Sequence, residues 1–125
     1  MLAWFITFIQ SPIEEVRNRR EPVDKEKILA RWNAGVGSTD WLDQLVKNGL
    51  IKEERHGGYP DYYHGTAREI LPFLADGPPA FKGFPVLGDD YFLPVGWIEV
   101  SIFEREKIAV CPPEEQVTVM VWDMS

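Results

Sequence analysis

Hydrophobic positions divide the chain into segments with strand-like and helix-like spacing. Residues 2–9 are apolar on both period-two faces, which is typical of a strand covered on both sides. Strand patterns recur at residues 97–103 and 117–122, and a third short strand is predicted at 108–111 after the charged turn 104–107. We therefore expect the N-terminal strand to lie inside a mainly antiparallel sheet together with the C-terminal strands.

Helical signals fill much of the first half of the chain. A capping signal that begins at Ser11 predicts a helix over residues 12–20. The spacing of apolar residues predicts a second helix over residues 24–34 and a third over residues 39–48. These three helices would form an insertion between the first strand and the rest of the sheet.

A hairpin and one further helix are predicted next. A short strand at residues 50–52 and a returning strand at residues 59–64 flank a Gly-Gly turn. A second capping box begins at Thr66 and opens a helix in which Pro72 should cause a kink or an early end. Residues 78–96 are rich in proline and glycine and are predicted to form a structured loop.

This order of elements predicts an α+β fold in a single globular domain, residues 1–125. Its mainly antiparallel sheet would combine the N-terminal strand with a C-terminal meander, and the helical segment and the hairpin would be insertions. The longest apolar run, residues 2–9, is shorter than the roughly 20 residues that a membrane span needs, and it lacks the features of a secretory signal. A single cysteine, Cys111, excludes an internal disulfide and favours a cytoplasmic location.

The net charge of −7 is concentrated in residues 69–125, which carry ten acidic and three basic side chains. Such a field repels nucleic acid and anionic lipid and attracts basic proteins. We therefore expect a basic protein partner and neither nucleic acid nor a membrane. Asp89, Asp90, Glu114 and Glu115 are the leading candidates for contacting that partner.

An aromatic segment supplies the other candidate binding residues, Tyr59, Asp61, Tyr62, Tyr63 and His64. A tyrosine has an apolar ring and a hydrogen-bonding tip, which suits recognition. Alternation along a strand places Tyr62 and His64 on one face and the other three on the opposite face, so at least one ring should face solvent. We expect Tyr62 or Tyr63 to be an anchor; in the alternative, all three tyrosines pack under the helix that follows.

Residues 25–64 also have the order helix, turn, helix, strand, turn, strand, which resembles a winged helix-turn-helix. The solvent face of its recognition helix would present Asp40, Asp43, Gln44 and Lys47, with a net charge of −1. A DNA-binding helix needs several lysines or arginines to neutralise phosphates, and this face lacks them. DNA binding is therefore not predicted. A winged-helix-like regulatory or adaptor module remains an alternative.

The two histidines are candidates for metal binding or catalysis. His56 and His64, with Asp61 between them, could hold a metal, but their spacing matches none of the common ligand patterns. Cys111 has no neighbouring histidine and is interpreted as a structural thiol. The chain has no phosphate-binding loop and no catalytic serine motif. We predict no metal and no cofactor; the least favoured alternative is a small enzyme that uses His56 or His64 beside Asp61 or Glu69.

A compact, acidic, aromatic-rich domain without a catalytic motif resembles the immunity proteins that bacteria produce together with polymorphic or contact-dependent toxins. The resemblance is one of size, charge and composition, and it implies no particular site residue. It implies an inhibitor that neutralises a basic, nuclease-type toxin domain. A negative surface with interleaved tyrosine and tryptophan can steer toward a basic protein and then bind it in competition with nucleic acid.

Overall fold

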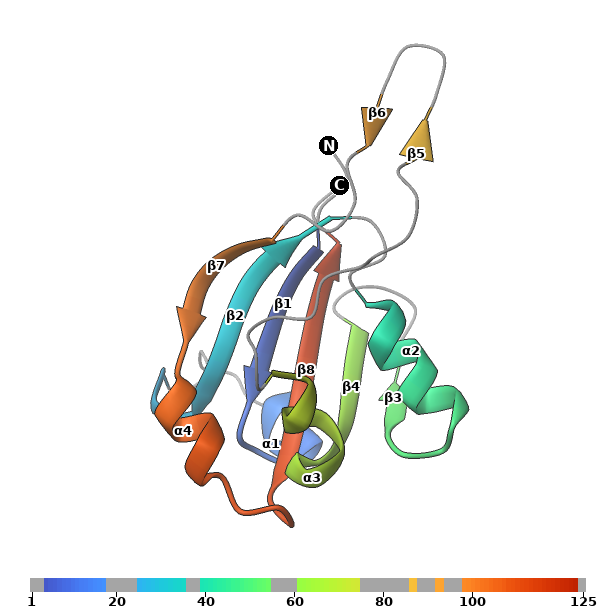
Figure 1. The fold of residues 1–125 in the computed structure, drawn as a ribbon. Coiled ribbons are helices and arrows are strands. Elements are labelled where there is room, and N and C mark those ends of the chain that lie inside the picture. Colours follow the sequence, from blue (N-terminus) through green and yellow to red (C-terminus); the bar gives the residue numbers. More distant parts are fainter. Residues whose placement is uncertain are drawn as a thin grey trace.

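Strand β1 (Trp4–Ile9) lies in the interior of a six-stranded sheet. The computed structural model describes residues 4–17, 25–35, 39–54, 61–74, 86–87, 92–93 and 98–123. All neighbouring strands of this sheet are antiparallel, and their order is β3 (Lys52–Glu54), β4 (Asp61–Thr66), β8 (Gln116–Asp123), β1, β2 (Ile28–Ala34) and β7 (Ile98–Phe103). The predicted α+β fold and the interior position of the N-terminal strand are confirmed (Figure 1).

Residues 28–34 form strand β2, so the helix predicted over residues 24–34 is wrong. Only a three-residue 3-10 helix, η1 (Lys25–Lys27), precedes the strand. The apolar residues of this segment fit both periods, since Ile28, Ala30 and Trp32 also alternate. Pairing of β2 with β1 on one side and β7 on the other decides in favour of the strand, because tertiary context overrides a weak local propensity.

Residues 105–110 form helix α4 (Arg105–Val110), so the strand predicted at residues 108–111 is also wrong. Charged residues and alanine favour a helix here, and the N–H of Ile108 donates to the carbonyl of Glu104 at 3.0 Å. Consequently β7 and β8 are not neighbours in a meander. The first pairs with β2, and the second lies between β1 and β4.

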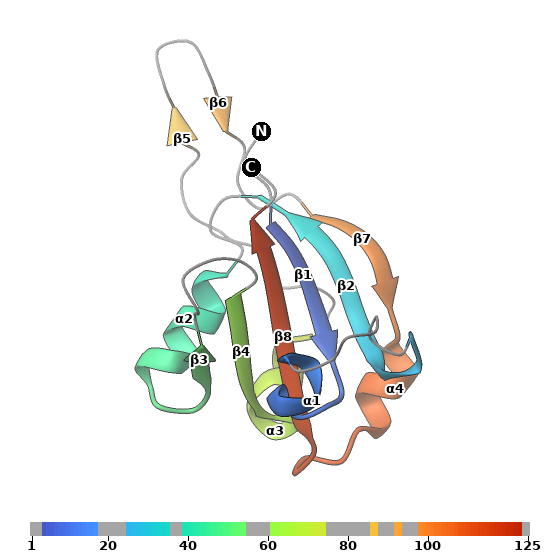
Figure 2. The same ribbon diagram turned by 180° about the vertical axis from the view of Figure 1, so that it is seen from behind.

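Helices cover the two faces of the sheet unequally. Helices α2 (Asp40–Lys47), α3 (Ala67–Ile70) and α4 lie over the face that we call the front face (Figure 1). Of the α-helices in the described parts of the chain, α1 (Ile13–Arg17) alone lies over the opposite, back face, at one end of the sheet (Figure 2). The predictions of helices over residues 12–20 and 39–48 are confirmed where the structure describes them; residues 18–20 lie outside the described residues. None of the helices in the described parts of the chain has the length and apolar character to cross a bilayer.

The helix that follows β4 ends early, as its proline predicts. After four residues α3 becomes the 3-10 helix η2 (Leu71–Leu74). Pro72 has no N–H to donate, and its ring interferes with the carbonyl four residues earlier. The result is a short, bent segment that directs Leu71 and Leu74 into the protein.

The capping box predicted at Thr66 does not form, because this side chain makes no capping hydrogen bond. The first two N–H groups of α3, those of Ala67 and Arg68, instead donate to the carbonyls of Glu115 (2.9 Å) and Pro113 (3.1 Å). Backbone carbonyls of the turn before β8 thus accept the N–H groups that have no partner within the first turn of α3.

The core lies between the front face and its helices. Phe8 and Trp32 stack with ring centroids 4.9 Å apart, and Trp41 of α2 stacks on Phe8 at 5.9 Å. Fully buried aliphatic side chains from the sheet and the helices complete it, among them Ile6, Leu42, Ile70, Leu74, Val117 and Val119.

Within the segment predicted as a loop, residues 78–96, strands β5 (Val86–Leu87) and β6 (Phe92–Leu93) form a separate two-stranded ladder. The remainder of that segment lies outside the described residues.

Candidate functional site

The winged-helix interpretation is wrong, because the first of its two helices is strand β2 in the interior of the sheet. The predicted recognition helix does exist as α2, and it exposes Asp40 and Lys47. Its apolar side contributes Leu42 and Leu45 to the core. Helix α2 therefore acts as a cover for the front face.

Tyr63 is a core residue and not a surface anchor. Its side chain is 3% exposed, and its hydroxyl donates to Asp43 Oδ1 of α2 at 2.6 Å. Strand β4 has a neighbouring strand on each side, and the hydrogen bond from Tyr63 to Asp43 joins its front face to α2. Asp61 shares this face and Tyr59 lies outside the described residues, which leaves Tyr62 as the accessible tyrosine described in this segment.

His64 lies on the back face with Tyr62, and its side chain is 17% exposed. Its Nε2 atom is buried and lies 3.4 Å from Oε1 of Glu54 on β3. Asp61, three residues earlier, points to the opposite face of the same strand. The enzyme alternative that pairs His64 with Asp61 is therefore not supported; His56 lies outside the described residues.

Glu69, the other proposed partner of a catalytic histidine, does line a cavity with His64. This cavity has a volume of about 330 Å³ and is also lined by Lys52, Thr66 and Gln116. Of the two pairs that involve His64, the pair with Glu69 therefore shares a cavity, as the enzyme alternative requires.

The two acidic candidates that the structure describes, Glu114 and Glu115, do not share a face of the sheet with Tyr62. Glu114 is exposed and its Oε1 lies 3.1 Å from Nη2 of Arg68, while Glu115 is half-buried in the same turn. This turn is attached to α3, on the front side of the sheet. Asp89 and Asp90 lie outside the described residues.

Cys111 is half-buried, and burial followed by the charge of Glu115 raises the pKa of its thiol. A thiol with a raised pKa is a poor nucleophile at neutral pH, in keeping with a structural role. In the parts of the chain that the structure describes, no group of three or more His, Cys, Asp or Glu side chains could hold a metal ion.

Strand pairing instead assembles an exposed aromatic surface that the sequence did not reveal. We call it the back-face patch; it consists of Phe5, Arg31, Tyr62, Met120 and Trp122. Trp122 is 38% exposed and the other four are half-buried. Helix α1 covers the sheet only beyond this patch, where Thr118 Oγ1 donates to the carbonyl of Ser11 at 2.8 Å.

The register places the patch residues in two adjacent rows across the sheet. One row runs from Tyr62 through Met120 and Thr7 to Arg31, on strands β4, β8, β1 and β2. In the other row, Trp122 lies directly opposite Phe5. Four strands spaced by about 4.8 Å give the patch a width of roughly 15 Å.

Arg31 is held in a defined position within the patch. Its guanidinium carbon lies 5.3 Å from the centroid of the Phe5 ring, and its Nε donates to Thr7 Oγ1 at 3.2 Å. The ring and the hydroxyl restrict an otherwise flexible side chain, so less entropy remains to be lost on binding.

The apolar residues of segment 2–9 include Phe5 of this patch, but the prediction that both faces of the strand are covered left no exposed aromatic residue to expect there. Ile6 to Ile9 are buried, whereas Trp4 and Phe5 are only half-buried. Helix α1 contacts β8 near Thr118, while Phe5 and Trp122, farther along the back face, remain partly exposed. Comparison with protein-family models, curated proteins and solved structures finds no match to this chain.

Proposed function

We propose that this protein is a protein-binding inhibitor that uses the back-face patch, and specifically an immunity protein that neutralises a basic, nuclease-type toxin domain in the cytoplasm. The observation that supports it best is the composition of the patch. Trp, Tyr, Phe, Met and Arg, each present there once, are the residue types enriched in protein interfaces.

Three of the five, Trp122, Tyr62 and Arg31, belong to the types that dominate binding hot spots. They come from three different strands, so a rigid sheet and not a loop fixes their relative positions. A preorganised surface of this kind loses little conformational entropy when a partner binds.

The size of the patch fits the centre of an interface. A standard interface buries about 800 Å² on each partner, more than a patch of roughly 15 Å across can supply. Residues around the patch must therefore contribute the remaining interface area. On the same side of the molecule, Glu14 and Glu15 of α1 and Glu99 of β7 are exposed.

These carboxylates around the patch and the net charge of −7 favour a basic partner. Exposed charges around an apolar centre mainly accelerate association, while the buried anchors slow dissociation. A nuclease domain carries basic residues that bind phosphates, so an acidic protein covering them would exclude the nucleic-acid substrate.

The test is affinity capture from the native host with the wild-type chain and Trp122→Ala. A stoichiometric basic protein should be captured by the wild type, and Trp122→Ala should bind it with at least about thirtyfold lower affinity, the loss of roughly 2 kcal/mol expected for a hot-spot residue. Addition of the wild-type chain at a one-to-one ratio should abolish the nucleic-acid cleavage of that partner.

Phe73→Ala is the matched control. Phe73 is an aromatic residue with 46% exposure on η2, so it lies on the front side and outside the patch. Its removal should leave the affinity unchanged. Equal affinities for wild type and Trp122→Ala would exclude the back-face patch from the interface.

The cavity shared by His64 and Glu69 supports one alternative, a small enzyme with His64 as acid–base group. The two functions differ in their response to ionic strength. Charge-steered association slows as salt rises, whereas turnover of a neutral small molecule does not.

A further inference from the structure

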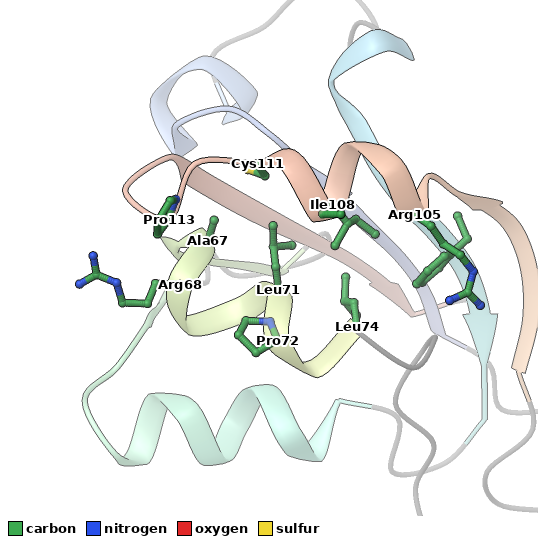
Figure 3. A pocket seen from close by; sticks show the side chains of 11 residues that line it. Ala67, Arg68, Leu71, Pro72, Leu74, Arg105, Ile108, Cys111 and Pro113 are labelled. Atoms are coloured by element: carbon green, nitrogen blue, oxygen red, sulfur yellow. The ribbon is translucent and has the colours of Figure 1, made fainter.

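A groove of about 500 Å³ lies on the front side of the molecule, between the α3–η2 segment and α4. Figure 3 shows the two segments facing each other, with Leu71 and Leu74 directed toward Ile108 across the groove. Neither of its two sides belongs to the back-face patch, so the groove is independent of the proposed function.

The walls of the groove are apolar. Leu71 and Leu74 on one side are buried, while Ile108 and Phe103 on the opposite side are half-buried. Among the described residues that line it, only two arginines and one cysteine carry polar side-chain atoms. Such walls can accept a hydrocarbon chain, but they cannot satisfy the hydroxyls of a sugar or the edges of a base.

The two arginines lie at opposite ends of the groove (Figure 3). Arg68 is paired with Glu114 at 3.1 Å, so its charge is already offset. Arg105 lies over the Phe103 ring, with its guanidinium carbon 5.0 Å from the ring centroid, and no carboxylate lies within ion-pair distance among the described residues. The apolar groove therefore ends at a cation that is available to an anion.

We propose that this groove binds a free alkyl carboxylate of medium chain length, with its hydrocarbon chain on Leu71, Leu74 and Ile108 and its carboxylate on the guanidinium of Arg105. A volume of about 500 Å³ is within the range of small-ligand sites. The guanidinium presents a fork of N–H donors that matches a carboxylate, and the Phe103 ring keeps it at the groove end.

Cys111, the single cysteine of the chain, lines the groove and reports on its occupancy. Burial and Glu115 raise the pKa of its thiol, so alkylation by iodoacetamide is followed above pH 9.0, the ordinary pKa of the group. The probe is decanoate below its micelle concentration, added to the full chain. Decanoate should slow the alkylation in a saturable manner, and its affinity by calorimetry should rise about fourfold for each added methylene from octanoate to decanoate.

Arg105→Gln tests the carboxylate contact. It should weaken decanoate binding about tenfold, the loss expected for a charge-assisted hydrogen bond, and leave binding of 1-decanol unchanged. Lys107→Gln is the matched control, since it removes the same charge from the same helix without lining the groove. Arg105 is exposed, whereas Lys107 is half-buried and donates to the carbonyl of Glu26 at 3.2 Å, so circular dichroism verifies the fold of each variant.

The outcomes separate clearly. Saturable protection of Cys111 that depends on Arg105 and not on Lys107 supports the proposal. Absence of protection, or equal affinity for decanoate and 1-decanol, overturns it. Retention of decanoate affinity in Ala109→Trp, which places an indole in the groove from an exposed position, would locate the binding elsewhere and also overturn it.

Discussion

Tyr62 and Tyr63 are adjacent in β4 and have opposite environments, because successive side chains of a strand point to opposite faces. Tyr62 lies half-buried on the back face, opposite Met120. Tyr63 lies in the core and connects β4 to α2 through Asp43. Alternation alone predicts that the two rings lie on opposite faces of the strand. Which ring is buried depends on the face against which α2 packs, and no local sequence pattern determines that face.

The Tyr63 hydroxyl gives a prediction at this scale. Tyr63→Phe should lower the free energy of unfolding by about 2 kcal/mol, since it removes a hydrogen bond to a carboxylate and leaves Asp43 without that donor. Urea unfolding followed by circular dichroism measures the change. Tyr62→Phe, which removes a hydroxyl from the half-buried ring on the back face, should change stability by no more than about 0.5 kcal/mol.

The same hydroxyl should make stability sensitive to alkaline pH. Burial, and then Asp43, raise the pKa of Tyr63 far above its ordinary value of 10.0. Above pH 10 the unfolded chain loses this proton and the folded chain keeps it, so the folded state is progressively disfavoured. The contribution is fully present below pH 10 and falls by up to about 1.4 kcal/mol per pH unit above it. A Tyr63→Phe variant with the same alkaline slope as wild type would contradict this assignment.

The back-face patch was only partly predictable from single residues. Tyr62 was found because it lies in a conspicuous aromatic segment. Phe5, Met120 and Trp122 were interpreted as parts of apolar strands, and Arg31 was placed in a helix. These residues become neighbours only through pairing between strands that are far apart in sequence, and the pairing is not visible in any one segment.

At the scale of elements, the segments with one unambiguous signal were predicted correctly. The strands at residues 97–103 and 117–122 and the helix at residues 39–48 each have one consistent period, and residues 2–9 are an apolar run of strand length followed by polar residues. The segment 24–34 fits two periods, and the choice between them came from its neighbours in the sheet. Local signals therefore determine an element where they agree, and tertiary pairing determines it where they conflict.

The interior strand gives a prediction about its most buried residue. Ile6 is fully buried between Trp32 and Val121 on the neighbouring strands. Ile6→Asp should abolish cooperative folding, since an unpaired buried charge costs several kcal/mol of a total stability of about 5–15 kcal/mol. Thermal unfolding by circular dichroism tests this. Val100→Asp, which introduces the same charge at a position 48% exposed on β7, should fold.

Close packing between β4 and the residue before β3 gives a prediction about Gly65. A Cβ atom added to Gly65 would lie 2.7 Å from Cγ2 of Ile51, a side chain in the core. Gly65→Ala should therefore lower the free energy of unfolding by about 1–3 kcal/mol.

Ile51→Ala alone should cost about 2–5 kcal/mol through the cavity that it leaves. In the double variant the new methyl group occupies part of that space, so the combined loss should be smaller than the sum of the single losses. A double-mutant cycle by urea unfolding measures the coupling, and strictly additive losses would show that the contact between Gly65 and Ile51 does not limit the packing.

For the whole molecule, the division of the sheet into a covered front face and a partly open back face sets the expected site of binding. Charge substitutions on the two faces can test which face binds the partner. The net charge of −7 attracts a basic partner to the whole molecule, whereas a carboxylate beside the patch acts on the partner only at close range. Glu99 on β7 and Glu106 on α4 are both exposed and lie on opposite sides of the sheet. Their substitution by lysine changes the net charge equally.

Glu99→Lys should slow association with the captured basic partner about threefold at low salt relative to Glu106→Lys, a difference of the size expected for an exposed charge pair. The difference should shrink as ionic strength rises from about 0.1 M to 1 M, where the screening length falls from about 10 Å to about 3 Å. Stopped-flow association rates over a salt series measure both effects. Equal rates for the two variants would mean that only the overall charge steers the partner, and a slower rate for Glu106→Lys would place the interface on the helical side of the sheet.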